Sequence, residues 1–207
     1  MARSSQPTLF LLAGPNGAGK STLYADRIKP KTSAPFVNAD LILEAWQAER
    51  GGASPDDAYA ASKEAAAQRE QLISERRSFV SETVFSHPSK LTLIQRALDA
   101  GYRVVLFHVN VRHADFSVAR VAARVIMGGH PVPEDKIRER YDRNPALIRE
   151  AADLAAVTHV YDNSRVGQPP RWLLTLERGE VVRQCRDKTL PDWAEALYFQ
   201  HVDSRPG

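Results

Sequence analysis

The fold of this chain is decided by the stretch Gly14-Pro15-Asn16-Gly17-Ala18-Gly19-Lys20-Ser21-Thr22. This stretch matches the pattern G-x-x-x-x-G-K-[ST], in which the backbone N–H groups of a glycine-rich loop surround a phosphate. An apolar run at residues 9–13 precedes the loop and predicts a buried strand, and a helix is expected from about Lys20 to Arg27. Strand, loop and helix together predict a site for a nucleoside triphosphate, with residues 14–22 as its binding loop.

Two side chains of the loop are expected to carry the chemistry of phosphate binding. Lys20 should reach the β and γ phosphates, and Ser21 should ligate Mg²⁺. The helix that begins near Lys20 directs the positive end of its dipole toward the same anion. The loop therefore predicts Mg²⁺ as a cofactor beside the nucleotide.

Beyond the loop, strand-like and helix-like patterns alternate along the chain. Strands are expected at residues 9–13, 35–38, 78–83, 103–109 and 158–162, and helices at 40–50, 54–77 and 88–100. Gly51-Gly52 should close one helix, and Pro55 should start the next. Alternating strands and helices form parallel sheets that are covered on both faces. We therefore predict a three-layer α/β fold of the nucleotide-kinase type, with a central parallel five-stranded sheet.

The C-terminal part of the chain has a different pattern. Residues 172–177 and 180–185 predict an antiparallel hairpin, and a short helix is expected around 192–199. A chain of 207 residues is long enough for one well-cored domain and too short for two of ordinary size. We therefore expect residues 1–207 to form a single domain.

Composition limits the environment and the partners of the protein. Lys and Arg total 28 and Asp and Glu total 25, so the net charge of +3 gives no reason to expect a nucleic-acid partner. The single Cys185 cannot form an internal disulfide. No apolar stretch approaches the length that spans a bilayer, and the first residues lack the apolar core of a signal peptide. The cytoplasm is the compartment we expect.

The absence of certain motifs excludes several classes of phosphate-loop protein. The chain has neither the N-K-x-D and D-x-x-G of switch GTPases nor the L-S-G-G-Q of transporter ATPases. Its fourth predicted strand runs into Asn110 rather than into the Asp-Glu pair of ring and motor ATPases. This pattern favours a small-molecule kinase.

Polar residues follow the second and third predicted strands, at the sheet edge where ligands bind in α/β folds. Asn38 and Asp40 end the second strand, and Glu82 and Thr83 end the third, so all four are expected to bind the substrate. Asp40 is placed either to act as the base for an attacking hydroxyl or to cap the helix that follows. Glu82 is placed either to hold Mg²⁺ through water and bind substrate, or to be a satisfied strand-end acid.

Residues from about 113 to 141 are rich in arginine and are expected to form a lid. Its candidate residues for stabilising charge on a transferring phosphoryl group are Arg120, Arg124, Arg138 and Arg140. Arg120 and Arg124 are four residues apart and so share a helical face. The alternative for any one of the four is an ordinary solvated arginine or a structural ion pair. The run 128–133 interrupts the segment, with His130 as a hinge. A second helix is expected from about Pro133, with a restart at Asn144-Pro145.

The combined motifs resemble those of the zeta toxin family of kinases. The resemblance rests on residues 14–22, Asn38-Ala39-Asp40, Ser81-Glu82-Thr83, residues 120–141 and Tyr161-Asp162-Asn163-Ser164. It implies ATP or GTP with Mg²⁺ as cofactors, phosphorylation of the 3′-hydroxyl of the sugar in UDP-N-acetylglucosamine, and an inhibitory antitoxin as partner.

The resemblance also implies a role for each site residue. Lys20 would be the phosphate lysine, Asp40 the base and Glu82 a substrate-binding acid, which joins Ser21 near the metal. Arg124 would act with Arg138 or Arg140 on the phosphoryl group, and Arg120 would help to bind the nucleotide. The alternatives are a kinase of a nucleoside, a nucleic-acid end or an antibiotic, and a non-catalytic ATP-binding interaction module.

Overall fold

The structure is a computed structural model that describes residues 6–50, 54, 56–129, 131–187 and 189–199. Its strands are β1 (Thr8–Ala13), β2 (Phe36–Val37), β3 (Phe79–Thr83), β4 (Arg103–Asn110), β5 (Val157–Asp162), β6 (Arg171–Glu177) and β7 (Glu180–Gln184). The predicted helix boundaries at Gly51-Gly52 and Pro55, and the hinge at His130, lie outside the described residues.

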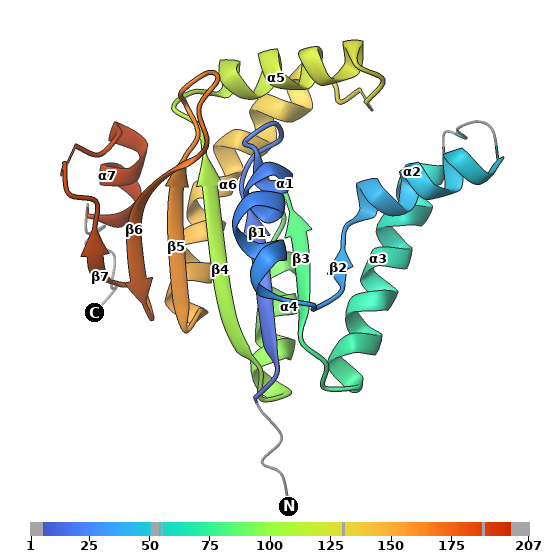
Figure 1. The fold of residues 1–207 in the computed structure, drawn as a ribbon, viewed down its shortest axis with the longest axis horizontal. Coiled ribbons are helices and arrows are strands. Elements are labelled where there is room, and N and C mark those ends of the chain that lie inside the picture. The colour runs from blue at the N-terminus through green and yellow to red at the C-terminus, as the bar shows by residue number, and fades with distance from the viewer. Residues whose placement is uncertain (1–5, 51–53, 55, 130, 188, 200–207) are drawn as a thin grey trace, which may run out of the picture.

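The helical segments follow the predicted alternation with the strands (Figure 1). The N-terminal ones are α1 (Lys20–Leu23), the π-helical η1 (Tyr24–Ile28), the 3₁₀-helical η2 (Lys29–Lys31), α2 (Ala39–Arg50), α3 (Asp57–Ser74) and α4 (Ser89–Asp99). The C-terminal ones are α5 (Ala114–Ile126), α6 (Glu134–Leu154) and α7 (Asp192–Tyr198).

One sheet organises the molecule, with strand order β2-β3-β1-β4-β5-β6-β7. The first five of these strands pair in parallel, as predicted. The predicted C-terminal antiparallel hairpin is also present, but the sheet has seven strands rather than five, because β6 pairs antiparallel with β5 and β7 with β6. The hairpin thus covers the open edge of β5, whose unpaired backbone groups would otherwise be exposed, and extends the sheet to seven strands.

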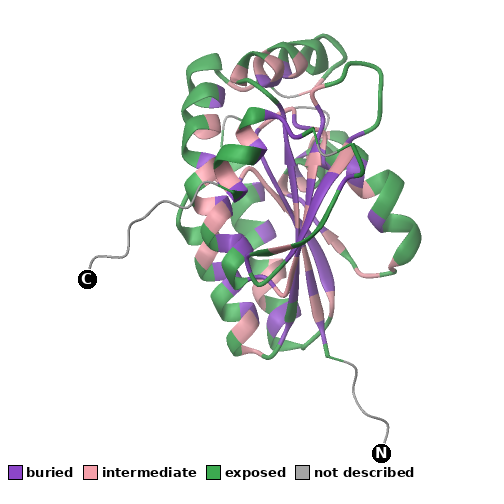
Figure 2. Ribbon diagram, turned by 90° about the vertical axis from the view of Figure 1, so that its left-hand side faces the viewer, coloured by how far each residue is buried: buried purple, intermediate pink, exposed green. Residues whose placement is uncertain are grey.

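The two faces of the sheet are covered unequally, as Figure 2 shows with the sheet seen near its edge. Alternate residues of β1 point to opposite faces. Leu9 and Leu11 belong to the larger core cluster, which also contains buried side chains of α3, α4, α6 and α7. Leu12 belongs to a smaller cluster under α1 and η1, with Leu23 and Ile28. The predicted layers on both faces are confirmed, with most of the apolar burial on one of them.

Two proline positions differ from the prediction. The helical run after the phosphate loop continues through η2, which has Pro30 in its first turn. Helix α6 runs without a break through Pro145, so the predicted restart is wrong. The buried Asn144 donates from Nδ2 to the carbonyl oxygens of Val84 at 2.6 Å and Phe85 at 3.2 Å. Contacts with the loop after β3 therefore fix the segment around Pro145. The periodicity of the sequence cannot predict such contacts between distant residues.

Replacing Asn144 should test this anchor. Asn144→Ala leaves the carbonyl of the buried Phe85 without its donor, so we expect the free energy of unfolding to fall by about 1–3 kcal/mol. Urea unfolding measures the loss, with Asp142→Ala, an exposed position of the same helix, as the control. Equal stability of the two variants would contradict the anchor.

A buried histidine links β4 to the C-terminal helix. His108 is fully buried, its Nδ1 lies 2.7 Å from the Tyr198 hydroxyl oxygen, and its ring meets Trp193 edge-on. Burial lowers the pKa of His108 from 6.5 to about 3, because the charged imidazolium would lose its hydration.

This depressed pKa predicts a loss of stability in acid. Between about pH 6.5 and about pH 3 the unfolded chain binds a proton at His108 that the folded chain does not. The free energy of unfolding should therefore fall with decreasing pH, by up to about 1.4 kcal/mol per pH unit from this group. Urea unfolding at several pH values should show a shallower slope for His108→Gln, and an unchanged slope for the exposed His87→Gln. An unchanged slope in His108→Gln would refute the assignment.

Candidate functional site

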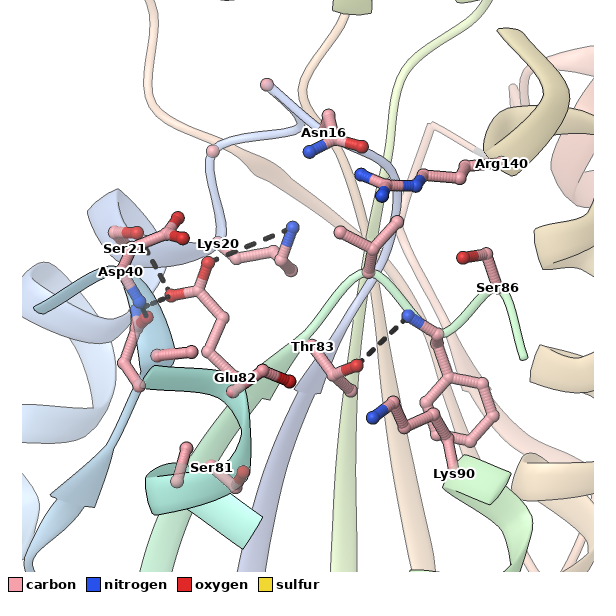
Figure 3. A pocket seen from close by; sticks show the side chains of 18 of the residues that line it. Asn16, Lys20, Ser21, Asp40, Ser81, Glu82, Thr83, Ser86, Lys90 and Arg140 are labelled. Carbon is pink, nitrogen blue, oxygen red and sulfur yellow. Dashed lines mark hydrogen bonds and ion pairs between the residues drawn. The ribbon is translucent and has the colours of Figure 1, made fainter. Parts of the chain in front are cut away.

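A cavity of about 600 Å³ opens at the carboxyl ends of the central strands. Seven parts of the fold form its walls: the phosphate loop, the start of α2, the end of β3, one face of α3, the start of α4, and helices α5 and α6. Figure 3 shows side chains from these elements converging on the space above β1 and β3. Ligands of parallel α/β sheets bind at this edge.

The phosphate loop needs its glycines for steric reasons. Gly14, Gly17 and Gly19 have φ values of 149°, 67° and 90°, which side chains of L residues rarely adopt. A Cβ at Gly14 would collide with the carbonyl oxygen of Val109, and one at Gly19 would collide with the side-chain amide of Asn163. The backbone therefore passes closer to its neighbours than any other residue allows.

Asn163 supports this loop from the end of β5. Its Nδ2 donates to the carbonyl oxygen of Ala18 at 2.8 Å, and its own N–H donates to Asn110 at 2.8 Å. Asn163 of the predicted motif thus holds the loop in place, whereas the Ser164 hydroxyl donates to Asp162.

Lys20 is held inside the site. Its side chain is only 6% exposed, and Nζ donates to the carbonyl oxygens of Gly14 and Pro15, each at 3.0 Å. Burial lowers the pKa of Lys20, while the charges of Glu82 and Asp40 act in the opposite direction. The ammonium group is thus fixed beside the loop by carbonyl dipoles and one nearby carboxylate.

Glu82 connects three parts of the site. Ser21 donates from Oγ to Glu82 Oε2 at 3.0 Å, Asn38 donates from Nδ2 to the same oxygen at 3.2 Å, and Lys20 Nζ lies 3.8 Å from Oε1. The parallel register of β1 and β3, which pairs Leu12 with Glu82, brings these groups together.

The oxygen atoms of Ser21 and Glu82 fit a magnesium ion. Mg²⁺ prefers oxygen ligands and is commonly held by one or two carboxylates together with phosphate oxygens and water. The part of the chain that the structure describes contains no cluster of three His, Cys, Asp or Glu residues. The hydroxyl–carboxylate pair beside the phosphate loop is therefore the donor set that suits the ion.

Asp40 does not cap α2, because Asn38 does. The Oδ1 atom of Asn38 accepts a hydrogen bond from the backbone N–H of Asp40 at 2.8 Å, at the start of α2. The carboxylate of Asp40 lines the cavity and accepts no hydrogen bond from the described residues. Figure 3 shows it near Ser21 and Glu82, and its charge acts on Lys20. The sequence allowed two roles for Asp40, as a helix cap or as a group that faces a ligand. In the structure its carboxylate faces the cavity.

The arginines of the lid segment divide into two groups. Arg120, Arg124 and Arg140 line the cavity, whereas Arg138 does not. The Arg138 guanidinium lies 2.7 Å from Asp115 and 2.8 Å from Glu134, and so ties the starts of α5 and α6 together. Positions 138 and 140 are about 200° apart around a helix, so only one of them can face the cavity.

Arg120 fastens α5 to the phosphate loop. Its guanidinium donates to the carbonyl oxygens of Asn163 at 2.6 Å and Gly17 at 3.3 Å. A Cβ at Gly17 would lie only 3.0 Å from the carbonyl oxygen of Ser117, so α5 packs directly on the loop. The structure thus brings Arg120 to the nucleotide-binding loop, as expected from the sequence, through contacts that the sequence did not indicate.

Several lining residues were missed by sequence reasoning, namely Ser62, Ala65 and Arg69 of α3, and Ser81, Ser86 and Lys90. Sequence analysis predicted a helix over residues 54–77 but named none of its three lining residues as a site residue. Their spacing of three and four residues, which places them on one helical face, was the available signal.

The predicted site residues therefore assemble with one exception. Asn16, Gly17, Gly19, Lys20, Ser21, Thr22, Asn38, Asp40, Glu82, Thr83, Arg120, Arg124 and Arg140 line the cavity. Gly14, Pro15 and Ala18 lie buried beneath it in the same loop. Arg138 lies outside.

The zeta toxin family matches residues 1–167. The chain belongs to this family. Membership confirms the resemblance seen in the motifs and, with this fold and phosphate loop, places the chain among the P-loop phosphotransferases.

Individual relatives are distant. An uncharacterized protein of Haemophilus influenzae is 27% identical over 136 residues, which cover 66% of this chain and 94% of that protein. A chain of the PezAT toxin-antitoxin system of Streptococcus pneumoniae has a TM-score of 0.60 at 17% identity, covering 95% of this zeta toxin family member and 79% of that chain. A chain of the AvrRxo1-ORF1:-ORF2 complex with ATP has a TM-score of 0.63 at 18% identity.

The AvrRxo1 match covers 86% of this chain and 60% of the other, so this zeta toxin family member spans less than two thirds of that protein. At such identities the structural likeness establishes the fold alone. No helix in the described ranges is both long and apolar enough to cross a membrane.

The division of the lid arginines can be tested with a matched pair. Arg140→Gln should reduce phosphoryl transfer by roughly 10³-fold, because it removes a cation from the cavity. Arg138→Gln breaks only exposed ion pairs, to Asp115 and Glu134, and should change the rate by less than about 3-fold. Single-turnover measurements of ATP consumption compare them. Equal losses in both variants would show that the two positions do not differ in this way.

Proposed function

We propose that this protein transfers the γ-phosphate of ATP, or of GTP, to a hydroxyl group of a nucleotide sugar such as UDP-N-acetylglucosamine. The observation that carries the proposal is the placement of Lys20, Glu82 and Asp40 around one cavity at the mouth of the phosphate loop. Family membership and the ATP held by the AvrRxo1-ORF1:-ORF2 complex support it.

The proposed reaction divides the work among residues of this chain. Lys20 and the loop N–H groups hold the β and γ phosphates, and Asp40 orients the acceptor hydroxyl and takes its proton. A bond forms between the acceptor oxygen and the γ phosphorus as the bond to the β,γ-bridging oxygen breaks, and ADP leaves. Arg124 and Arg140 offset the negative charge that spreads over the phosphoryl oxygens.

We further propose that Ser21 and Glu82 hold Mg²⁺ with the triphosphate. A bound Mg²⁺ ion would supply charge neutralisation at the β and γ phosphates. The two donor oxygens lie 3.0 Å apart on the side of the cavity that also holds Lys20.

In this proposal α5, the first part of α6 and their connection, about residues 113–141, form the lid of a single kinase domain. The lid can close around anchors that remain in place, since Arg120 holds α5 on the loop and the Tyr141 hydroxyl donates to Val111 at 2.8 Å. Closing would bring cations to the phosphates and exclude water, which strengthens their attraction.

We also propose an inhibitory antitoxin as the protein partner. Two structural relatives support this, since one belongs to a toxin-antitoxin system and the other is a complex of ORF1 with ORF2. Co-purification of this chain with the product of a neighbouring reading frame would test the assignment.

The role of Asp40 separates a kinase from a module that only binds nucleotide. Asp40→Asn should lower the rate of transfer by roughly 10²- to 10⁴-fold, because the amide cannot take a proton. Its affinity for Mg-ATP should stay within about 3-fold of the wild type, measured by calorimetry. Glu44→Gln, an exposed position one turn further along α2, is the control.

Mass spectrometry of a metabolite extract treated with protein and Mg-ATP identifies the acceptor. Transfer by Asp40→Asn at the wild-type rate would remove Asp40 as the base. If wild-type protein binds ATP but phosphorylates nothing in the extract, the kinase proposal itself fails.

A further inference from the structure

The cavity extends beyond Glu82 into a second compartment that the phosphate loop does not reach. Arg69 enters it from α3, and Lys90 enters it from the first turn of α4. Figure 3 shows Lys90 below Thr83, at the end of the cavity away from Asn16 and Lys20. Both cationic side chains are half-buried.

No described carboxylate neutralises this pair of cations. The side chains of Arg69 and Lys90 form no hydrogen bond or ion pair with any described residue, although the backbone N–H of Lys90 donates to the carbonyl oxygen of His87 at 3.1 Å. Burial lowers the pKa of both, and the only charged group that acts on Lys90 is Arg69, which lowers its pKa further. Glu70, the one acid that acts on Arg69, is itself paired with Arg96. Two like charges thus share a compartment partly shielded from water.

The walls of the compartment are small and polar. Ser62 and Ala65 precede Arg69 on the same face of α3, and Ser86 lies opposite on the loop after β3. The hydroxyl of Ser81 lines the cavity, is 1% exposed and has no hydrogen-bond partner among the described residues. Small side chains leave room here, and an unpaired buried hydroxyl costs free energy unless something bonds to it.

We propose that Arg69 and Lys90 form a subsite for a phosphate group carried by the acceptor. The planar guanidinium can bind two phosphate oxygens and the ammonium a third, while the acceptor hydroxyl extends back toward Asp40. This inference rests on the proposed kinase function and narrows its substrate class to phosphorylated alcohols. Neutral nucleosides and cationic antibiotics, both open as acceptors on sequence grounds, lack the group that this subsite binds.

The subsite also has a consequence for the protein without substrate. Two unneutralised cations in one half-buried compartment repel each other, so removing one of them relieves that repulsion. Lys90→Gln should therefore raise the melting temperature of the ligand-free protein. The control Lys29→Gln removes the same charge from an exposed lysine outside the cavity and should leave the melting temperature unchanged.

Binding at the subsite can be measured apart from catalysis. The phosphate loop is first filled with a non-hydrolysable ATP analogue and Mg²⁺, so that a second anion cannot bind there. Inorganic phosphate should then raise the melting temperature of the wild type and of Lys29→Gln. Lys90→Gln and Arg69→Gln should need roughly 10- to 100-fold more phosphate for the same shift, and Lys90→Arg should recover most of it. Equal responses in the wild type and both glutamine variants would overturn the proposal.

Kinetics with matched acceptors give an independent measurement. N-acetylglucosamine, its 1-phosphate and UDP-N-acetylglucosamine share a sugar and differ in the phosphate. Lys90→Gln should raise KM for the phosphate-bearing acceptors roughly 10- to 100-fold, with kcat and the KM for ATP within about 3-fold. Preference of the wild type for the neutral sugar would overturn the subsite. If the wild type transfers phosphate to none of them but still shows the Lys90-dependent shift, the subsite stands and the proposed nucleotide-sugar acceptor is wrong.

Discussion

The parallel pairing of β1 with β3 is the constraint on which the site depends. It sets Glu82 beside Leu12, directly before the phosphate loop, and so brings one carboxylate within reach of Lys20, Ser21 and Asn38. A shift of one residue would turn Glu82 to the other face of the sheet. The fully buried apolar residues on both sides of these strands fix the register, so core packing maintains the polar geometry above it.

Helices α5 and α6 are attached to two different parts of the cavity wall. Arg120 joins α5 to the phosphate loop, whereas Asn144 joins α6 to the loop that follows β3. Phe85 in that loop is fully buried with a φ of 59°, a conformation that costs free energy for a bulky residue. The amide of Asn144 bonds to its carbonyl oxygen and helps to hold that conformation. Helix α6 is therefore mechanically connected to the loop after β3, which forms part of the cavity wall.

The positive charges that line the cavity are compensated unequally by the described residues. Near the phosphate loop Lys20 is satisfied by carbonyl oxygens and Glu82, whereas Arg69 and Lys90 face each other without a described acid between them. Stability alone would favour neutral residues at these two positions. Such destabilising arrangements are typical of binding sites, where the ligand restores the missing interactions.

The sequence by itself determined the phosphate loop, the alternation of strands and helices, and the acids at the strand ends, because these depend on local spacing. It could not determine that the hairpin joins the sheet, that α6 passes through Pro145, or which of Arg138 and Arg140 faces the cavity, since these depend on contacts between distant segments. Only the tertiary structure brought Arg69 and Lys90 together. Their positions lie 21 residues apart in the chain, in two different helices, and local spacing within either helix cannot show that both side chains line one compartment.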